Sequence, residues 1–368
     1  MKRDTAFLSY LALRATAAAG ALLAGVCQTY TFARVLDAHR FSLFIVIGNL
    51  GLSLWLFDLG IAKVLYVNLR AHFLGGRLAD ERMGVQAMAV VAAYGALVVL
   101  GGIGIGLMWA SGRSGGGWVE AVDFALFFIY SALNLVWFAL RNISSATDQY
   151  LFFEGLEAAR RVGHLALMFC LLAALPFTLF LLASNAVWIV LLVMICARLR
   201  RRGGLAGRLG EAPAALVAFF RGNRSALLGS GGYAAGEMVI YNFPSVLVPA
   251  VHGLGAPTII FDTVFKIFRG ATVLFSAACD LLVPRQTQAY AQRDHRQVRR
   301  ATAFAFALAA VPALALCVLL LVAGDRVYAL LLGGRVTVPS SFTPLVVGQI
   351  VCKLFQTVSN YVLVHTGF

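Results

Sequence analysis

The sequence has 368 residues, of which 61% are hydrophobic and only 12% charged, and its net charge is +14. Soluble domains carry about 25% charged residues, so this composition excludes a soluble globular protein and predicts an all-α protein that crosses a membrane many times. The six cysteines show no CxxC or other metal-binding spacing. Neither a metal site nor a disulfide framework is therefore indicated.

Ten stretches are apolar over the roughly 20 residues that a membrane-spanning helix needs. The first follows a basic start, as in a signal peptide, but its apolar character continues to about Thr31, which predicts a retained helix. The fifth and sixth are divided only by a very short connection at Pro176. In chain order the ten predicted spans lie near residues 9–33, 41–67, 85–110, 119–141, 156–175, 177–198, 223–251, 257–283, 301–323 and 342–365.

The connections between these spans alternate in charge. Of the 30 Lys and Arg residues, 20 lie at the N-terminus and after the second, fourth, sixth and eighth spans, whereas five lie in the other connections. The positive-inside rule therefore predicts that both termini are cytoplasmic. Because this topology accounts for most of the positive charge, a nucleic-acid partner is not expected.

The longest basic connection, residues 198–224, contains several glycines and a proline. We therefore predict two helical bundles, a six-helix lobe of residues 1–198 and a four-helix lobe of residues 223–368. A basic cytoplasmic linker of residues 199–222 would join them. Its arginines also suit anionic lipid headgroups, so membrane lipids are expected partners.

Charged residues inside the spans are candidates for function, because a charge in the hydrocarbon is costly unless it faces protein or water. In the eighth span, Asp262, Lys266 and Arg269 fall on one narrow stripe, and the first two can pair at i,i+4. Such a stripe indicates either a water-filled cavity or a static seam of ion pairs. The charged residues within spans include at least these nine candidates: Arg14, Asp58, Lys63, Glu237, Asp262, Lys266, Arg269, Asp280 and Lys353.

Two further spans present a polar face. Gln28 lies on the face of the first span that carries Arg14, and Gln349 lies on the face of the tenth span that carries Lys353. Both faces favour a polar cavity over contact with lipid.

Two carboxylates need a partner. Asp58 lies deep in the second span and would require a cation, a proton or water, and the cations of the first, eighth and tenth spans are candidate partners. Glu237 precedes Pro244 in the seventh span, and broken helices of this kind occur near transporter binding sites.

Two segments suggest a family. The segment "YTFARVLDAHRFSLFIVIGNLGLSLWLFDLGIAKVLYVNL" resembles the first two helices of Wzx-type polysaccharide flippases of the MOP superfamily, to which lipid II flippases and multidrug exporters are related. The segment "LLGGRVTVPSSFTPLVVGQIVCKLFQTVSNYVLVHTG" resembles the region of their ninth and tenth helices. Such flippases have about twelve or more helices in two six-helix lobes, so this chain would lack the last two.

The resemblance implies alternating access in the bacterial cytoplasmic membrane, with an undecaprenyl-pyrophosphate-linked oligosaccharide as substrate. It also implies polysaccharide polymerase and chain-length machinery as partners, and no cofactor beyond coupling to H⁺ or Na⁺. On this reading Asp58, Glu237 and Asp262 tune the cations or couple transport to an ion gradient. The residues that would bind the pyrophosphate and glycan are Arg14, Gln28, Lys266, Arg269, Gln349 and Lys353.

Three alternatives stay open. A MATE-like exporter of small cationic molecules should have an acidic and aromatic cavity. A membrane glycosyltransferase or polymerase should have a large external loop with catalytic residues, whereas the longest predicted here, residues 324–341, has Asp325 as its only carboxylate. A non-transporting paralogue would fit the missing helices. The sequence contains no P-loop motif, and we expect no enzyme activity.

Overall fold

The computed structural model describes residues 2–74, 81–111, 117–202, 211–241, 243–280, 282, 286, 289–290 and 292–366. These residues form helices and no strand, as the composition predicts. Each of the ten predicted spans falls on one helix or on a broken pair of helices. Among the described residues, six helices are both long and apolar enough to cross a membrane, so the count of ten spans stays a prediction.

Contacts between helices divide the chain into two compact units. Unit 1 comprises Met1–Phe41 and Gly255–Phe368, and unit 2 comprises Ser42–Leu254. The first helix is therefore grouped with the C-terminal helices, whereas the predicted lobes follow the order of the chain. That residues 1–198 and 223–368 act as the two lobes remains a prediction.

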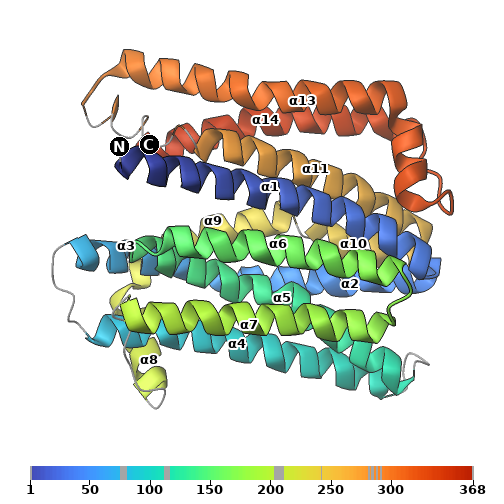
Figure 1. Cartoon of the computed structure of the whole chain (residues 1–368), viewed down its shortest axis with the longest axis horizontal. Helices are drawn as coiled ribbons and strands as arrows, with labels where there is room; N and C mark the ends of the chain where they lie inside the picture. Colours follow the sequence, from blue (N-terminus) through green and yellow to red (C-terminus); the bar gives the residue numbers. More distant parts are fainter. Residues whose placement is uncertain are drawn as a thin grey trace. The chain divides into compact units, whose positions relative to one another are not determined.

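Unit 1 is built from α1 (Lys2–Val35), α11 (Ala256–Asp280), α13 (His295–Leu332) and α14 (Phe342–Thr366). The last three share an apolar core, and α1 packs on α11 and α13 (Figure 1). α13 continues through a kink at Ala323, so the external loop predicted at 324–341 is helical as far as Leu332.

Unit 2 is centred on α5, which packs against α3, α4 and α7 (Figure 1). The ring of Phe44 lies 4.8 Å from that of Phe124 on α5 and shows how aromatic side chains fill the interior. The elements are α2 (Ala38–Ser53), the short 3-10 helix η1 (Leu54–Asp58), α3 (Ile61–Leu74), α4 (Glu81–Ala110), α5 (Trp118–Ala146), α6 (Tyr150–Leu172), α7 (Phe177–Arg202), α8 (Ala212–Gly222), α9 (Arg224–Tyr241) and α10 (Phe243–His252).

Two predicted spans are broken helices. The span 41–67 is interrupted by η1 and a turn in which Leu59 and Gly60 have φ angles of 42° and 77°. The span 223–251 divides into α9 and α10, and Pro244 is the second residue of α10. Proline is well tolerated there because the N–H that it lacks has no partner in the first turn of a helix.

Two other boundaries also differ from the prediction. The linker predicted at 199–222 contains the helix α8. The helix α6 begins at Tyr150, whereas the predicted span begins near residue 156. The break between α6 and α7 at Pro176 is confirmed.

Gly51 is expected to be essential for the contact between α2 and α5. A Cβ atom at this position would lie 2.9 Å from the carbonyl oxygen of Phe128 and 2.9 Å from the Cβ of Ser131. We expect Gly51→Ala to lower the free energy of unfolding by about 1–3 kcal/mol, because backbone atoms cannot move aside easily. Thermal unfolding of the detergent-solubilised protein measures this loss.

Gly95→Ala in α4 is the matched control for Gly51. A Cβ atom at Gly95 meets nothing within 4 Å, and alanine is favoured over glycine in a helix by up to about 1 kcal/mol. We therefore expect Gly95→Ala to be neutral or stabilising. Equal midpoints for the two variants would show that α2 and α5 do not pack as described.

Candidate functional site

The charged stripe on α11 joins that helix to α1. The ammonium nitrogen of Lys266 lies 2.7 Å from Oδ2 of Asp262, which confirms the predicted i,i+4 pair. The same nitrogen donates to the hydroxyl oxygen of Thr29 on α1 at 3.3 Å. Lys266 is thus held between two helices of unit 1, beside a carboxylate that is itself buried.

Aromatic rings on α11 lie under two further cations of unit 1. The guanidinium carbon of Arg269 is 4.5 Å from the ring centre of Phe265. Lys353 is buried on α14, where its ammonium nitrogen lies 5.9 Å from the ring centre of Phe268. The rings of Phe265 and Phe268 are stacked 5.9 Å apart, so cations from two helices share one aromatic surface.

The mid-helix part of α11 and α14 therefore carries more positive than negative charge. Lys266, Arg269 and Lys353 contribute three cations, and Asp262 contributes one carboxylate. Asp280 is the last residue of α11, and its backbone lies about 16 Å along the helix axis from that of Arg269. An excess of positive charge inside a membrane protein suits an anionic ligand.

Other predicted site residues have different environments. Gln28 is half-buried on α1, next to the residue that binds Lys266, and Gln349 is exposed on α14. Arg14 lies in α1 and Glu237 in α9, but their side chains are outside those described.

Asp58 lies in unit 2, where it caps the start of α3. Its Oδ1 accepts hydrogen bonds from the hydroxyl of Tyr94 at 2.8 Å and from the backbone N–H of Ala62 at 3.0 Å. Its Oδ2 accepts one from the backbone N–H of Gly60 at 3.1 Å. Backbone N–H groups at a helix start stabilise a carboxylate. Neutral hydrogen-bond donors therefore accommodate the buried carboxylate of Asp58. The sequence analysis had predicted cations of other spans as candidate partners instead.

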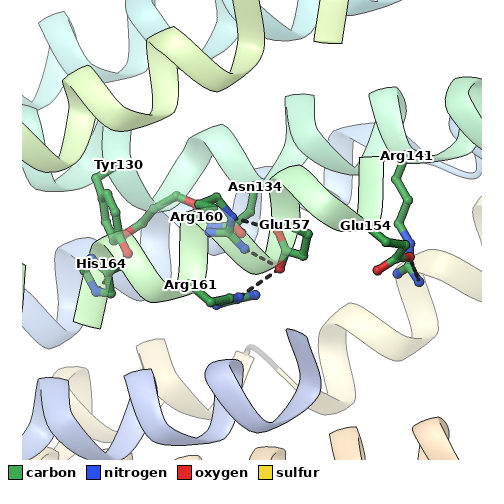
Figure 2. A network of polar contacts seen from close by, with 9 residues as sticks. Tyr130, Asn134, Arg141, Glu154, Glu157, Arg160, Arg161 and His164 are labelled. Carbon is green, nitrogen blue, oxygen red and sulfur yellow. Dashed lines mark hydrogen bonds and ion pairs between the residues drawn. The ribbon is translucent and has the colours of Figure 1, made fainter. Parts of the chain in front are cut away.

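A second charged cluster, shown in Figure 2, lies on α6 in unit 2. The guanidinium of Arg160 donates to both carboxylate oxygens of Glu157, each at 2.7 Å. Nε of Arg161 donates to the same carboxylate at 2.8 Å. Two arginines therefore share one carboxylate near the middle of a 23-residue helix.

Aromatic residues from the neighbouring helices hold this cluster. The guanidinium of Arg160 lies 4.3 Å from the ring centre of Trp188 on α7 and 5.7 Å from that of Trp137 on α5. The hydroxyl of Tyr130 on α5 lies 3.0 Å from Nε2 of His164, one turn further along α6 (Figure 2). Tyr130 is in the middle of α5, a helix long and apolar enough to span a membrane, so the cluster lies beside the middle of that helix.

Sequence reasoning missed this cluster, because Arg160 and Arg161 were counted with the basic connection after the fourth span, although both fall within the predicted span 156–175. A signal was present, since Glu157, Arg160, Arg161 and His164 recur at the three- and four-residue spacing of one helix face. Among the described residues, no group of His, Cys, Asp and Glu could hold a metal ion.

The fold is similar to solved structures of multidrug transporters. An inward-facing multidrug resistance MATE family transporter of the MOP superfamily is 14% identical, with 97% of this chain and 81% of that chain covered and a TM-score of 0.58. A MATE structure in the straight conformation is 13% identical, with 97% and 83% covered and a TM-score of 0.53. An outward-facing MATE family transporter is 12% identical, with 97% and 85% covered and a TM-score of 0.52.

These likenesses, together with the apolar helices, define a multi-pass membrane protein with the fold of MOP-superfamily transporters. No protein-family model matches the sequence, and no curated protein matches it. At 12–14% identity the likeness extends to the fold alone, and the substrate must be argued from the residues.

Proposed function

We propose that the protein is a flippase that moves a lipid-linked oligosaccharide, carried on undecaprenyl pyrophosphate, across the bacterial cytoplasmic membrane by alternating access. The observation that carries the proposal is the charge of α11 and α14. In the mid-helix part of these two helices three cations, Lys266, Arg269 and Lys353, accompany the carboxylate of Asp262. Diphosphate oxygens are strong acceptors for charge-assisted hydrogen bonds from such groups.

The remaining residues complete the proposed site. Arg14, Gln28 and Gln349 would contribute further donors to the diphosphate or the sugars. Asp58 and Glu237 would couple transport to an H⁺ or Na⁺ gradient. Both termini would be cytoplasmic, and a polysaccharide polymerase and chain-length machinery would be partners of the flippase.

Export of small molecules is the second candidate function, because the fold is similar to that of a multidrug resistance MATE family transporter. The likeness of the fold supports both candidates equally. The two differ in the charge that they require, because a site for cationic drugs needs an excess of carboxylates whereas a site for a diphosphate needs an excess of cations.

Complementation tests the proposal. In a bacterium that lacks its own glycan flippase, we expect the native chain to restore surface polysaccharide. Arg269→Gln and Lys266→Gln should each reduce it by about tenfold or more at matched membrane levels, since each removes a charge-assisted contact. Arg299→Gln is the control, because Arg299 is exposed in the second turn of α13 and has the same charge.

The same strains distinguish the two candidate functions. If the native chain restores no polysaccharide but lowers accumulation of a cationic dye, the flippase proposal is wrong and drug export replaces it. Rescue that survives both substitutions would keep the flippase activity but remove these two residues from the site.

A further inference from the structure

The arginine pair on α6 is a candidate binding site that the proposed function does not use. We propose that Arg161, positioned by Glu157 and accompanied by His164, forms a second anion-binding site in unit 2 that takes a phosphoryl group. The inference rests on the proposed function only for the source of that group, which is either the diphosphate of a lipid-linked glycan or a free phosphate.

The charge of the cluster calls for an anion. Arg160 and Arg161 share the single carboxylate of Glu157, which leaves one positive charge in excess among side chains that are largely buried. A buried charge without compensation is expensive, whereas a charge that meets an ionic ligand is not. A phosphoryl oxygen beside the arginines would balance the cluster.

The two arginines have different tasks. Arg160 is 5% exposed, donates to both oxygens of Glu157 and lies over Trp188, so it is fixed in place. Arg161 is 25% exposed, and its contact among the described residues is made by Nε alone. Its two Nη groups can therefore donate to a ligand, and a guanidinium fork matches the geometry of phosphate oxygens.

His164 supplies a second, independent observation. Its side chain is 7% exposed and lies three residues after Arg161, on the same face of α6. Nε2 lies 3.0 Å from the Tyr130 hydroxyl, whereas Nδ1 is buried and has no hydrogen-bond partner among the residues that the structure describes. Buried polar atoms without a partner are rare in folded proteins. A phosphoryl oxygen or hydroxyl at Arg161 would satisfy this nitrogen.

The experiment measures binding by the purified full-length protein in detergent. Farnesyl diphosphate, inorganic pyrophosphate and uncharged farnesol are titrated by calorimetry. All proteins carry Arg269→Gln, so that the proposed site on α11 and α14 contributes little. The variants are Arg161→Gln, Arg161→Lys and the exposed control Arg299→Gln.

We expect farnesyl diphosphate to bind and farnesol not to bind. Arg161→Gln should weaken binding of farnesyl diphosphate by about tenfold or more, and Arg161→Lys by less, because lysine keeps the charge without the fork. Arg299→Gln should change nothing. If inorganic pyrophosphate and farnesyl diphosphate bind with equal affinity, the ligand of the site is free phosphate. If farnesyl diphosphate binds more tightly than pyrophosphate, the ligand is the diphosphate of a lipid-linked glycan.

If Arg161→Gln changes the affinity for farnesyl diphosphate by less than twofold, the inference is wrong. It is also wrong if farnesyl diphosphate does not bind at all. Complementation separates this result from the proposed function. Glycan rescue with unchanged binding in Arg161→Gln removes the second site and leaves the flippase. Binding that depends on Arg161, without rescue by the native chain, leaves the anion site and removes the flippase.

Discussion

Replacing Glu157 with alanine is expected to destabilise the protein by about 3–5 kcal/mol, one of the two largest losses that we predict. The substitution removes the carboxylate that Arg160 and Arg161 share and leaves two neighbouring guanidinium groups inside the protein. Arg160 is 5% exposed, so water cannot replace the lost partner. The effect is measured by heating the detergent-solubilised protein and determining the fraction that stays monodisperse at each temperature.

Two comparisons make this prediction specific. Asp148→Ala breaks the ion pair with Arg70, whose partners are 30% and 49% exposed, and should cost less than about 1 kcal/mol. The triple variant Glu157→Leu, Arg160→Met, Arg161→Leu removes every charge of the cluster and should recover most of the stability. If Glu157→Ala is as stable as Asp148→Ala, the cluster does not carry a buried, shared charge.

Most helix positions could be predicted from the sequence, because apolar runs of about 20 residues leave few alternatives in a membrane protein. Breaks were predictable only where a residue type marks them. Pro244 indicates the break between α9 and α10. The break after η1 has no proline and depends on positive φ angles at Leu59 and Gly60, one of them at a residue that rarely adopts such a conformation.

Among the charged residues, one ion pair was predicted correctly and one charged cluster was missed. The pair of Lys266 and Asp262 could be predicted because i,i+4 spacing alone brings the two side chains together. Arg160 and Arg161 were assigned to a connection because the positive-inside rule counts arginines near helix ends. Glu157 lies three and four residues before them, so the same spacing predicts their ion pairs once the segment is taken as helical.

Contacts between helices could not be predicted at all. The position of Lys353 over Phe268 joins α14 to α11, and the bond from Lys266 to Thr29 joins α11 to α1. Hydrophobic periodicity shows which face of a helix is polar, but not which other helix that face meets.

Asp58→Ala is expected to cost about 3 kcal/mol or more. The Tyr94 hydroxyl and the N–H groups of Gly60 and Ala62 would lose their acceptor. Each buried donor without a partner costs about 1–3 kcal/mol, and the loss of a helix cap about 1 kcal/mol. Asp37→Ala is the matched control, since Asp37 accepts from the N–H of Arg40 at 2.9 Å in an exposed position. The same loss of thermal stability in both variants would contradict this account.

Asp58→Asn separates the structural role of this residue from the proposed role in ion coupling. Asparagine is as good a helix cap as aspartate and keeps one oxygen for the N–H groups or for Tyr94, so most of the stability should remain. It cannot take up and release a proton. We therefore expect Asp58→Asn to fold but to lose the dependence of transport on the H⁺ gradient, measured as glycan export with and without a protonophore. If glycan export by a folded Asp58→Asn protein still depends fully on the H⁺ gradient, Asp58 has no role in ion coupling. Its function is then to cap α3.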